Sequence, residues 1–105
     1  MLSVILSSCP PNQAAGLARA LVEQRLAACV SVLPGVQSTY RWQGEVQCEL
    51  EALLLIKTPS ERVAACMAGL KALHPFAVPE LVELPAGQVW PAYLQWAIEQ
   101  TQPIK

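Results

Sequence analysis

The sequence has little charge. Only 14% of its 105 residues are Asp, Glu, Lys or Arg, against about a quarter in an average soluble domain. The formal net charge is −1 and there is no basic run, so the electrostatic footprint of a nucleic-acid-binding or membrane-binding protein is missing. We therefore expect no nucleic acid and no membrane among its partners. Apolar residues reach 53%, and this excess of uncharged surface fits a protein that associates with copies of itself.

Motifs of catalytic centres are also missing. The sequence has no nucleophile elbow, no glycine-rich phosphate loop and no His-x-x-x-His pair, so an enzyme is the least supported class of protein. The four cysteines form no Cys-x-x-Cys pair, a pattern of neither a zinc finger nor a dense disulfide framework. We interpret them as reduced thiols in a reducing compartment. The apolar run Met1–Leu6 is too short for a signal peptide and lacks a basic start, so we expect a cytoplasmic protein.

Periodicity predicts one domain over residues 1–105, with elements in the order β-α-β-β-α-β-α. The expected elements are a strand over Ser3–Ser8, a helix from Asn12 as N-cap to about Arg25, strands over Cys29–Trp42 and Val46–Lys57, a helix that opens with a capping box over Thr58–Glu61 and stops at Pro75, an edge strand over Leu81–Leu84, and a last helix from about Pro91. This order is typical of an α+β ferredoxin-like βαββαβ sandwich with an extra C-terminal helix.

The two central strands are too long for the domain that contains them. At about 3.3 Å per residue, Cys29–Trp42 spans roughly 45 Å, whereas a compact domain of about 100 residues has a radius of gyration near 13 Å. We expect the hairpin to overhang, with a bulge at Pro34-Gly35. An overhanging arm with apolar side chains such as Val32 and Leu53 is tolerable only if another copy covers it. The sequence therefore predicts self-association and, because the arms bury further apolar area, resistance to heat.

Topology gathers potential ligands at one end of the predicted sheet. Right-handed crossovers direct the end of the first strand at Cys9, the turn after Trp42, the end of the second helix at His74 and the start of the last strand near Glu80 toward the same end. A thiolate and an imidazole suit Cu(I) or Zn(II). A buried thiol beside a helix-ending histidine accounts for the same residues without a metal.

Several segments resemble the divalent-cation tolerance proteins of the CutA family. They are Arg25–Cys29, Leu33–Gly35, Tyr40–Trp42, Gly44–Glu45, Leu55–Thr58, His74–Pro75, Val78–Glu80 and Tyr93–Trp96. The resemblance implies a cytoplasmic homotrimer with interlocked hairpins and a role linked to copper and other divalent metals. Its copper-linked residues correspond here to Cys9 and His74. The chain departs from the family pattern at Phe76-Ala77, at Leu73 and at Gln47-Cys48, so it has fewer ligands.

Other chemistry-bearing residues have two interpretations each. We expect Cys29 and Cys66 in the core and Cys48 exposed near the hairpin tip. Lys57 is either an anion ligand at a subunit seam or a solvated charge at the end of its strand. The three tryptophans, Trp42, Trp90 and Trp96, form either an aromatic cage or part of a trimer interface.

Three functions follow from these observations. The first is copper binding and metal tolerance through Cys9 and His74. The second is a trimeric small-ligand sensor resembling the PII proteins, and the third is a scaffold that anchors a partner protein. A nucleotide sensor needs basic residues and a glycine-rich loop in its cleft, and this sequence offers few of either.

Overall fold

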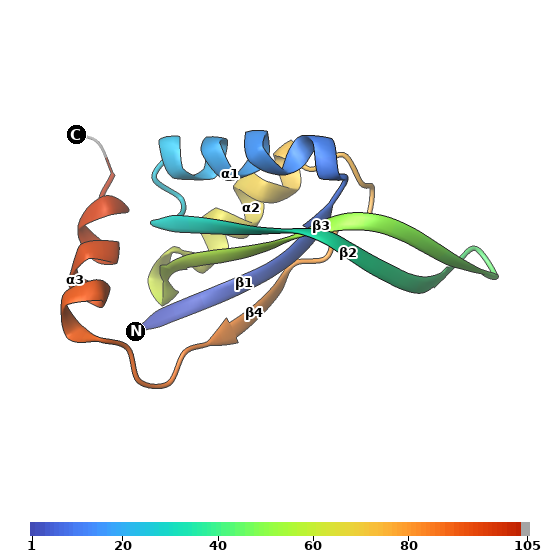
Figure 1. Ribbon diagram of the computed structural model, residues 1–105. Coiled ribbons are helices and arrows are strands. Elements are labelled where there is room, and N and C mark those ends of the chain that lie inside the picture. Colours follow the sequence, from blue (N-terminus) through green and yellow to red (C-terminus); the bar gives the residue numbers. More distant parts are fainter. Residues whose placement is uncertain (104–105) are drawn as a thin grey trace.

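The computed structural model describes residues 1–103 and has a four-stranded antiparallel sheet in the order β2-β3-β1-β4. Helices α1 and α2 cover one face of this sheet, and the C-terminal helix α3 lies at one end of it (Figure 1). The elements are β1 (Leu2–Cys9), η1 (Pro11–Gln13), α1 (Ala14–Glu23), β2 (Cys29–Trp42), β3 (Glu45–Pro59), η2 (Ser60–Arg62), α2 (Val63–Leu73), β4 (Val82–Pro85) and α3 (Pro91–Gln100). This confirms the predicted ferredoxin-like order and the edge position of the last strand. No helix among the described residues is long and apolar enough to cross a membrane.

One face of the sheet forms the main core with α1 and α2. Because side chains alternate across a strand and directly paired residues share a face, Ile5 on β1 and its partner Ile56 on β3 point the same way. Both are fully buried, as are Leu21 of α1 and Leu70 of α2. Most of the apolar stripe of each helix is therefore buried within one chain, although Val22 and Leu73 stay exposed.

The opposite face of the sheet is less well covered. The pairs Val4–Leu84 and Leu6–Val82 point to this side, and Val82 and Leu84 are exposed. Only the end near α3 is closed, where Leu2 and Ala97 belong to a second, smaller cluster. We call the side that α1 and α2 leave uncovered the open face.

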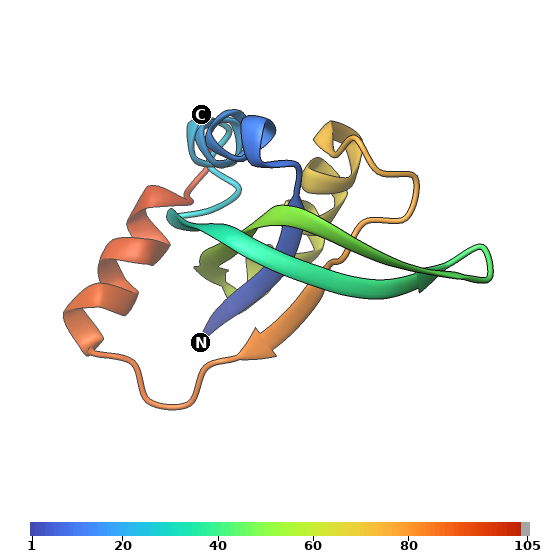
Figure 2. The ribbon, with the colours of Figure 1, turned by 45° about the vertical axis from the view of Figure 1, so that its right-hand side comes forward.

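The β2–β3 hairpin overhangs the rest of the fold, as the sequence predicted. Pairing runs from Cys29–Lys57 to Trp42–Glu45, with a register shift between Leu33 and Val36, and Figure 2 shows the resulting arm. Gly35 has φ +72° in this bulge, in the left-handed region that suits glycine. The arm lengthens the molecule to 45 × 29 × 21 Å.

The side chains that make the arm apolar differ from those expected. Val32 and Leu53 belong to the body of the sheet, since Leu53 pairs with Ser8 of β1 and Val32 pairs with Leu54, which also pairs with β1. The exposed apolar residues of the arm itself are Tyr40, Trp42, Val46 and Leu50.

Two predicted helix starts are wrong, whereas the end of the first helix is confirmed. Asn12 lies inside the η1 turn, and α1 begins after Gln13 without a side-chain cap. Thr58 remains in β3, where its hydroxyl donates to the Leu26 carbonyl at 2.8 Å, so it caps no helix. Helix α1 ends at Glu23, near Arg25 as predicted, because Arg25 has φ +59° and this left-handed conformation ends a helix.

Candidate functional site

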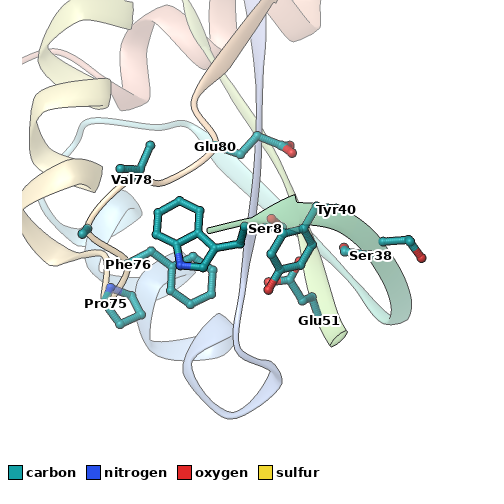
Figure 3. A pocket seen from close by; sticks show the side chains of 11 residues that line it. Ser8, Ser38, Tyr40, Glu51, Pro75, Phe76, Val78 and Glu80 are labelled. Atoms are coloured by element: carbon teal, nitrogen blue, oxygen red, sulfur yellow. The ribbon is translucent and has the colours of Figure 1, made fainter. Parts of the chain in front are cut away.

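A cavity of about 670 Å³ lies at the end of the sheet from which the hairpin projects. It is lined by residues of β1, the hairpin and the segment after α2: Ser8, Ser38, Thr39, Tyr40, Trp42, Glu51, Pro75, Phe76, Ala77, Val78 and Glu80 (Figure 3). Trp42 and Glu80 were expected at this end, and Ser8 and Pro75 are the chain neighbours of Cys9 and His74. The structure therefore gathers these four segments as the topology argument predicted.

His74 ends α2 and holds the following segment against β1. Its backbone is extended, with ψ 137°, as expected before Pro75. The ring Nδ1 accepts a hydrogen bond from the Phe76 N–H at 3.1 Å, so Nε2 carries the proton and donates to the Ser8 carbonyl at 2.8 Å. The ring is buried, and the Phe76 ring lies beside it with centroids 4.9 Å apart. Both nitrogens of the neutral imidazole are thus satisfied within the chain.

Cys9 is the residue after Ser8, whose carbonyl accepts the His74 hydrogen bond, but the Cys9 side chain lies in the main core. The thiol is fully buried, and Cys9 pairs with Ala52 on the face that α1 and α2 cover. Burial raises the pKa of the Cys9 thiol, and the Glu51 carboxylate raises it further. A metal that binds here has to displace the thiol proton.

The candidate metal ligands are few. Among residues 1–103, no group of three or more His, Cys, Asp or Glu side chains is arranged to hold a metal ion. Cys9 and His74 supply two soft donors beside the same peptide group, whereas stable metal centres use three or four ligands. A metal site at this place is complete only with a further ligand from water, from the backbone or from another copy of the chain.

Glu51 is the cavity residue that the sequence analysis missed. It is only 6% exposed, although it pairs with Val36 at the base of the overhanging arm. The pKa of the Tyr40 hydroxyl is raised, first by burial and then by the carboxylates of Glu49 and Glu51. The alternation of side chains along a strand could have placed Glu51. It is two residues from Leu53, so both side chains lie on the open face.

The remaining cysteines and Lys57 lie away from this cavity. Cys66 is fully buried and Cys48 is exposed, as predicted. Cys29 is half-buried rather than part of the core, because it faces the open side of the sheet with its partner Lys57. Lys57 is also half-buried, and its ammonium group donates to the Ser31 hydroxyl at 2.6 Å, so it is not a fully solvated charge.

The tryptophans form no common cage. Trp42 lines the cavity, whereas Trp90 and Trp96 do not. Trp90 is 77% exposed, and Trp96 packs against Tyr93 within α3.

The fold and the cavity define a class of small α+β proteins in which a ferredoxin-like sheet is extended by a hairpin arm. The family model described as CutA1 divalent ion tolerance protein matches residues 3–100, and the chain belongs to this family. It is 47% identical over 102 residues to the divalent-cation tolerance protein CutA of Thermus thermophilus, with 96% of this chain and 99% of that protein covered.

Solved structures agree with this assignment. The crystal structure of CutA from Xylella fastidiosa has a TM-score of 0.93 at 42% identity and covers 96% of this chain and 98% of that chain. A structure described as the PII-like protein CutA from Nostoc has a TM-score of 0.91 at 30% identity, with 97% and 99% covered. The predicted resemblance and fold are therefore confirmed.

Proposed function

We propose that this protein is a cytoplasmic homotrimer that binds copper through Cys9 and His74 and thereby contributes to divalent-metal tolerance. It binds the ion and catalyses no reaction. The family is named for divalent ion tolerance, and the two donors suit Cu(I). Four free cysteines fit a reducing compartment such as the cytoplasm.

The hydrogen bond from His74 Nε2 to the Ser8 carbonyl is the observation that carries this proposal. At 2.8 Å it holds the imidazole against the peptide group that joins Ser8 to Cys9. In this tautomer the lone pair is on Nδ1, where it accepts from the Phe76 N–H. Copper bound at Nδ1 displaces that N–H and leaves the bond to Ser8 in place. Copper bound at Nε2 displaces the Ser8 carbonyl and requires the ring proton to move to Nδ1, which then no longer accepts from Phe76. Metal binding at His74 therefore disturbs the segment that follows α2.

The trimer is proposed from the surfaces that one chain leaves uncovered. The hairpin arm exposes Tyr40, Trp42, Val46 and Leu50, and the open face exposes Val82 and Leu84. In the sheet order β2-β3-β1-β4, β2 and β4 are edge strands, and unpaired edges next to apolar surface favour pairing with another chain. A neighbouring copy is also a source for the missing metal ligand.

A Cu(I) titration under reducing conditions tests the copper site. We expect Cys9→Ser to abolish most binding and His74→Ala to weaken it, with the trimer retained in both. Cys48→Ser is the matched control, because its thiol is exposed near the hairpin tip, and it should leave affinity unchanged. Since copper displaces the Cys9 proton, the affinity should rise about tenfold per pH unit below the pKa of that thiol. Equal affinity in the wild type and the Cys9→Ser/His74→Ala double variant overturns the proposal.

A further inference from the structure

We infer that the cavity at the hairpin end is a binding site for an organic cation, an ammonium or guanidinium group carried on an apolar body. Glu51 is its counter-ion, and the rings of Trp42, Tyr40 and Phe76 surround the apolar part. The side chains of Cys9 and His74 are not part of its lining, although the site adjoins them through Ser8 and Phe76.

The buried carboxylate of Glu51 is the first argument. Glu51 is 94% buried, lines the cavity and points into it (Figure 3). Among residues 1–103, the structure gives this carboxylate no hydrogen-bond donor and no ion-pair partner, the one ion pair described being Arg19–Glu23 at the protein surface. The Glu51 oxygens are not among the fully buried side-chain atoms without a partner, so the small exposed part of this residue includes its carboxylate. Carboxylates on largely buried residues are usually paired or hydrogen-bonded. An unpaired carboxylate that faces a cavity therefore favours a cation as the occupant.

The charge of the surrounding side chains has the same sign. Glu80 also lines the cavity, and no Lys or Arg does. Burial and then Glu51 raise the pKa of the Cys9 thiol, and burial, then Glu49 and then Glu51 raise the pKa of the Tyr40 hydroxyl, which marks a region of negative potential. The same potential disfavours phosphates and nucleotides, so it separates this cavity from a nucleotide site.

The walls suit the rest of such a ligand. Trp42, Tyr40 and Phe76 line the cavity, and a cation over an indole or phenyl face is attracted by the ring quadrupole. Phe76 is held in place by its N–H bond to His74 and by contact with the His74 ring. Pro75 and Val78 add apolar surface. A fixed carboxylate within aromatic walls is the usual arrangement for recognition of an organic cation.

The size of the cavity fits a small molecule rather than a bare ion. Its volume of about 670 Å³ lies within the range of roughly 300–1,000 Å³ that holds drug-sized ligands. Two carboxylates without a third His, Cys, Asp or Glu ligand among the described residues are a poor site for a metal ion alone. The competing occupant is a Lys or Arg side chain from a second copy of this chain.

Binding of phenylbutylamine, with its neutral isostere phenylbutanol as the ligand control, tests the inference. Both are titrated into the full-length protein by calorimetry, with tryptophan fluorescence as a second signal. Glu51→Gln keeps the shape of the side chain and removes its charge. Glu61→Gln is the matched control, because Glu61 is exposed in η2 and lies outside the cavity.

We expect phenylbutylamine to bind at least about tenfold more tightly than phenylbutanol, and Glu51→Gln to weaken the amine about tenfold or more, as for loss of a charge-assisted hydrogen bond. Glu61→Gln and Cys9→Ser should not change its affinity. The unchanged affinity of Cys9→Ser separates this site from the copper site, so either can fail without the other.

A second pair of variants covers the case in which Glu51→Gln does not fold. Trp42→Leu removes an exposed ring from the cavity wall and should weaken the amine several-fold, whereas Trp90→Leu removes a more exposed ring outside the cavity and should not. Equal affinity for the amine and the alcohol, or no amine binding by the wild type, overturns the inference. So does a structure of the assembly in which a Lys or Arg of a second copy contacts Glu51.

Discussion

The two faces of the sheet differ in how much of their surface is buried within one chain. On the covered face, Ile5, Leu54 and Ile56 are fully buried against helices of the same chain. On the open face and along the arm, large apolar side chains stay exposed, and the buried carboxylate of Glu51 has no partner among the described residues. A surface that is complete within one chain accounts for folding, and a surface that is incomplete indicates where other molecules bind. Glu51 and the apolar arm are therefore where we expect other molecules to bind, whereas Cys9 lies at the edge of the covered core.

Charge introduced on the open face should have the largest effect. Leu84→Glu places a carboxylate where we expect a second copy to pack, and an unpaired buried charge is strongly unfavourable. We predict that this variant elutes as a monomer of 11.4 kDa in light-scattering measurements. Leu73→Glu is the matched control, because Leu73 of α2 is similarly exposed, at 40% against 46% for Leu84, but lies away from the open face. Retention of the trimer by Leu84→Glu would remove the open face from the interface.

Truncation in the covered core should come next. Ile56→Ala removes a fully buried side chain and should lower the free energy of unfolding by about 2–5 kcal/mol, through lost burial and the cavity left behind. Chemical denaturation of the trimer at fixed protein concentration measures this loss. An effect below about 1 kcal/mol would show that the core collapses around the truncation.

The pH dependence of stability is a second test of burial in the covered core. Burial raises the pKa of the Cys66 thiol from 9.0 to about 11, and Arg62 opposes this shift. The folded state then holds a proton that the unfolded state has released, so stability falls as the pH rises from about 9 to about 11, by about 2–3 kcal/mol in total. Unfolding curves of the wild type and Cys66→Ala across this range should differ in slope. Identical slopes would contradict the assignment to Cys66.

The smallest expected effect is a gain. Glu51→Gln removes a charge without a partner among residues 1–103 from a 94% buried residue, and single stabilising substitutions commonly add about 0.5–2 kcal/mol to stability. We predict a higher melting temperature for Glu51→Gln than for the wild type, and no change for Glu61→Gln. A lower melting temperature for Glu51→Gln would indicate that the carboxylate has a partner in the assembled protein.

The sequence predicted the sheet and the hairpin because their signals are local. The strand Cys29–Trp42 was predicted with the bounds that the structure has, since a long run of β-forming residues and the Pro34-Gly35 bulge define it. The gathering of Trp42, Glu80 and the neighbours of Cys9 and His74 followed from strand direction alone.

The errors arise where contacts between distant segments determine the local structure. Thr58 carries a strong helix-capping pattern, but its hydroxyl bonds to the Leu26 carbonyl on another segment. Cys29 has apolar neighbours in the sequence, but it pairs directly with Lys57, and both side chains therefore lie on the open face. Glu51 was missed because a charged residue in a strand is expected to be solvent-exposed, whereas the cavity around Glu51 is formed by segments far apart in the chain.

The central claim, that the hairpin end is the functional end, is tested most directly by locating copper in crystals grown with Cu(I) under reducing conditions. The account predicts an anomalous copper signal in every subunit between the Cys9 sulfur and the His74 ring, with the Phe76 bond to His74 broken and, if copper binds Nε2, the bond to Ser8 broken as well. A signal only at the exposed thiol of Cys48, or no ordered copper beside Cys9, would contradict it.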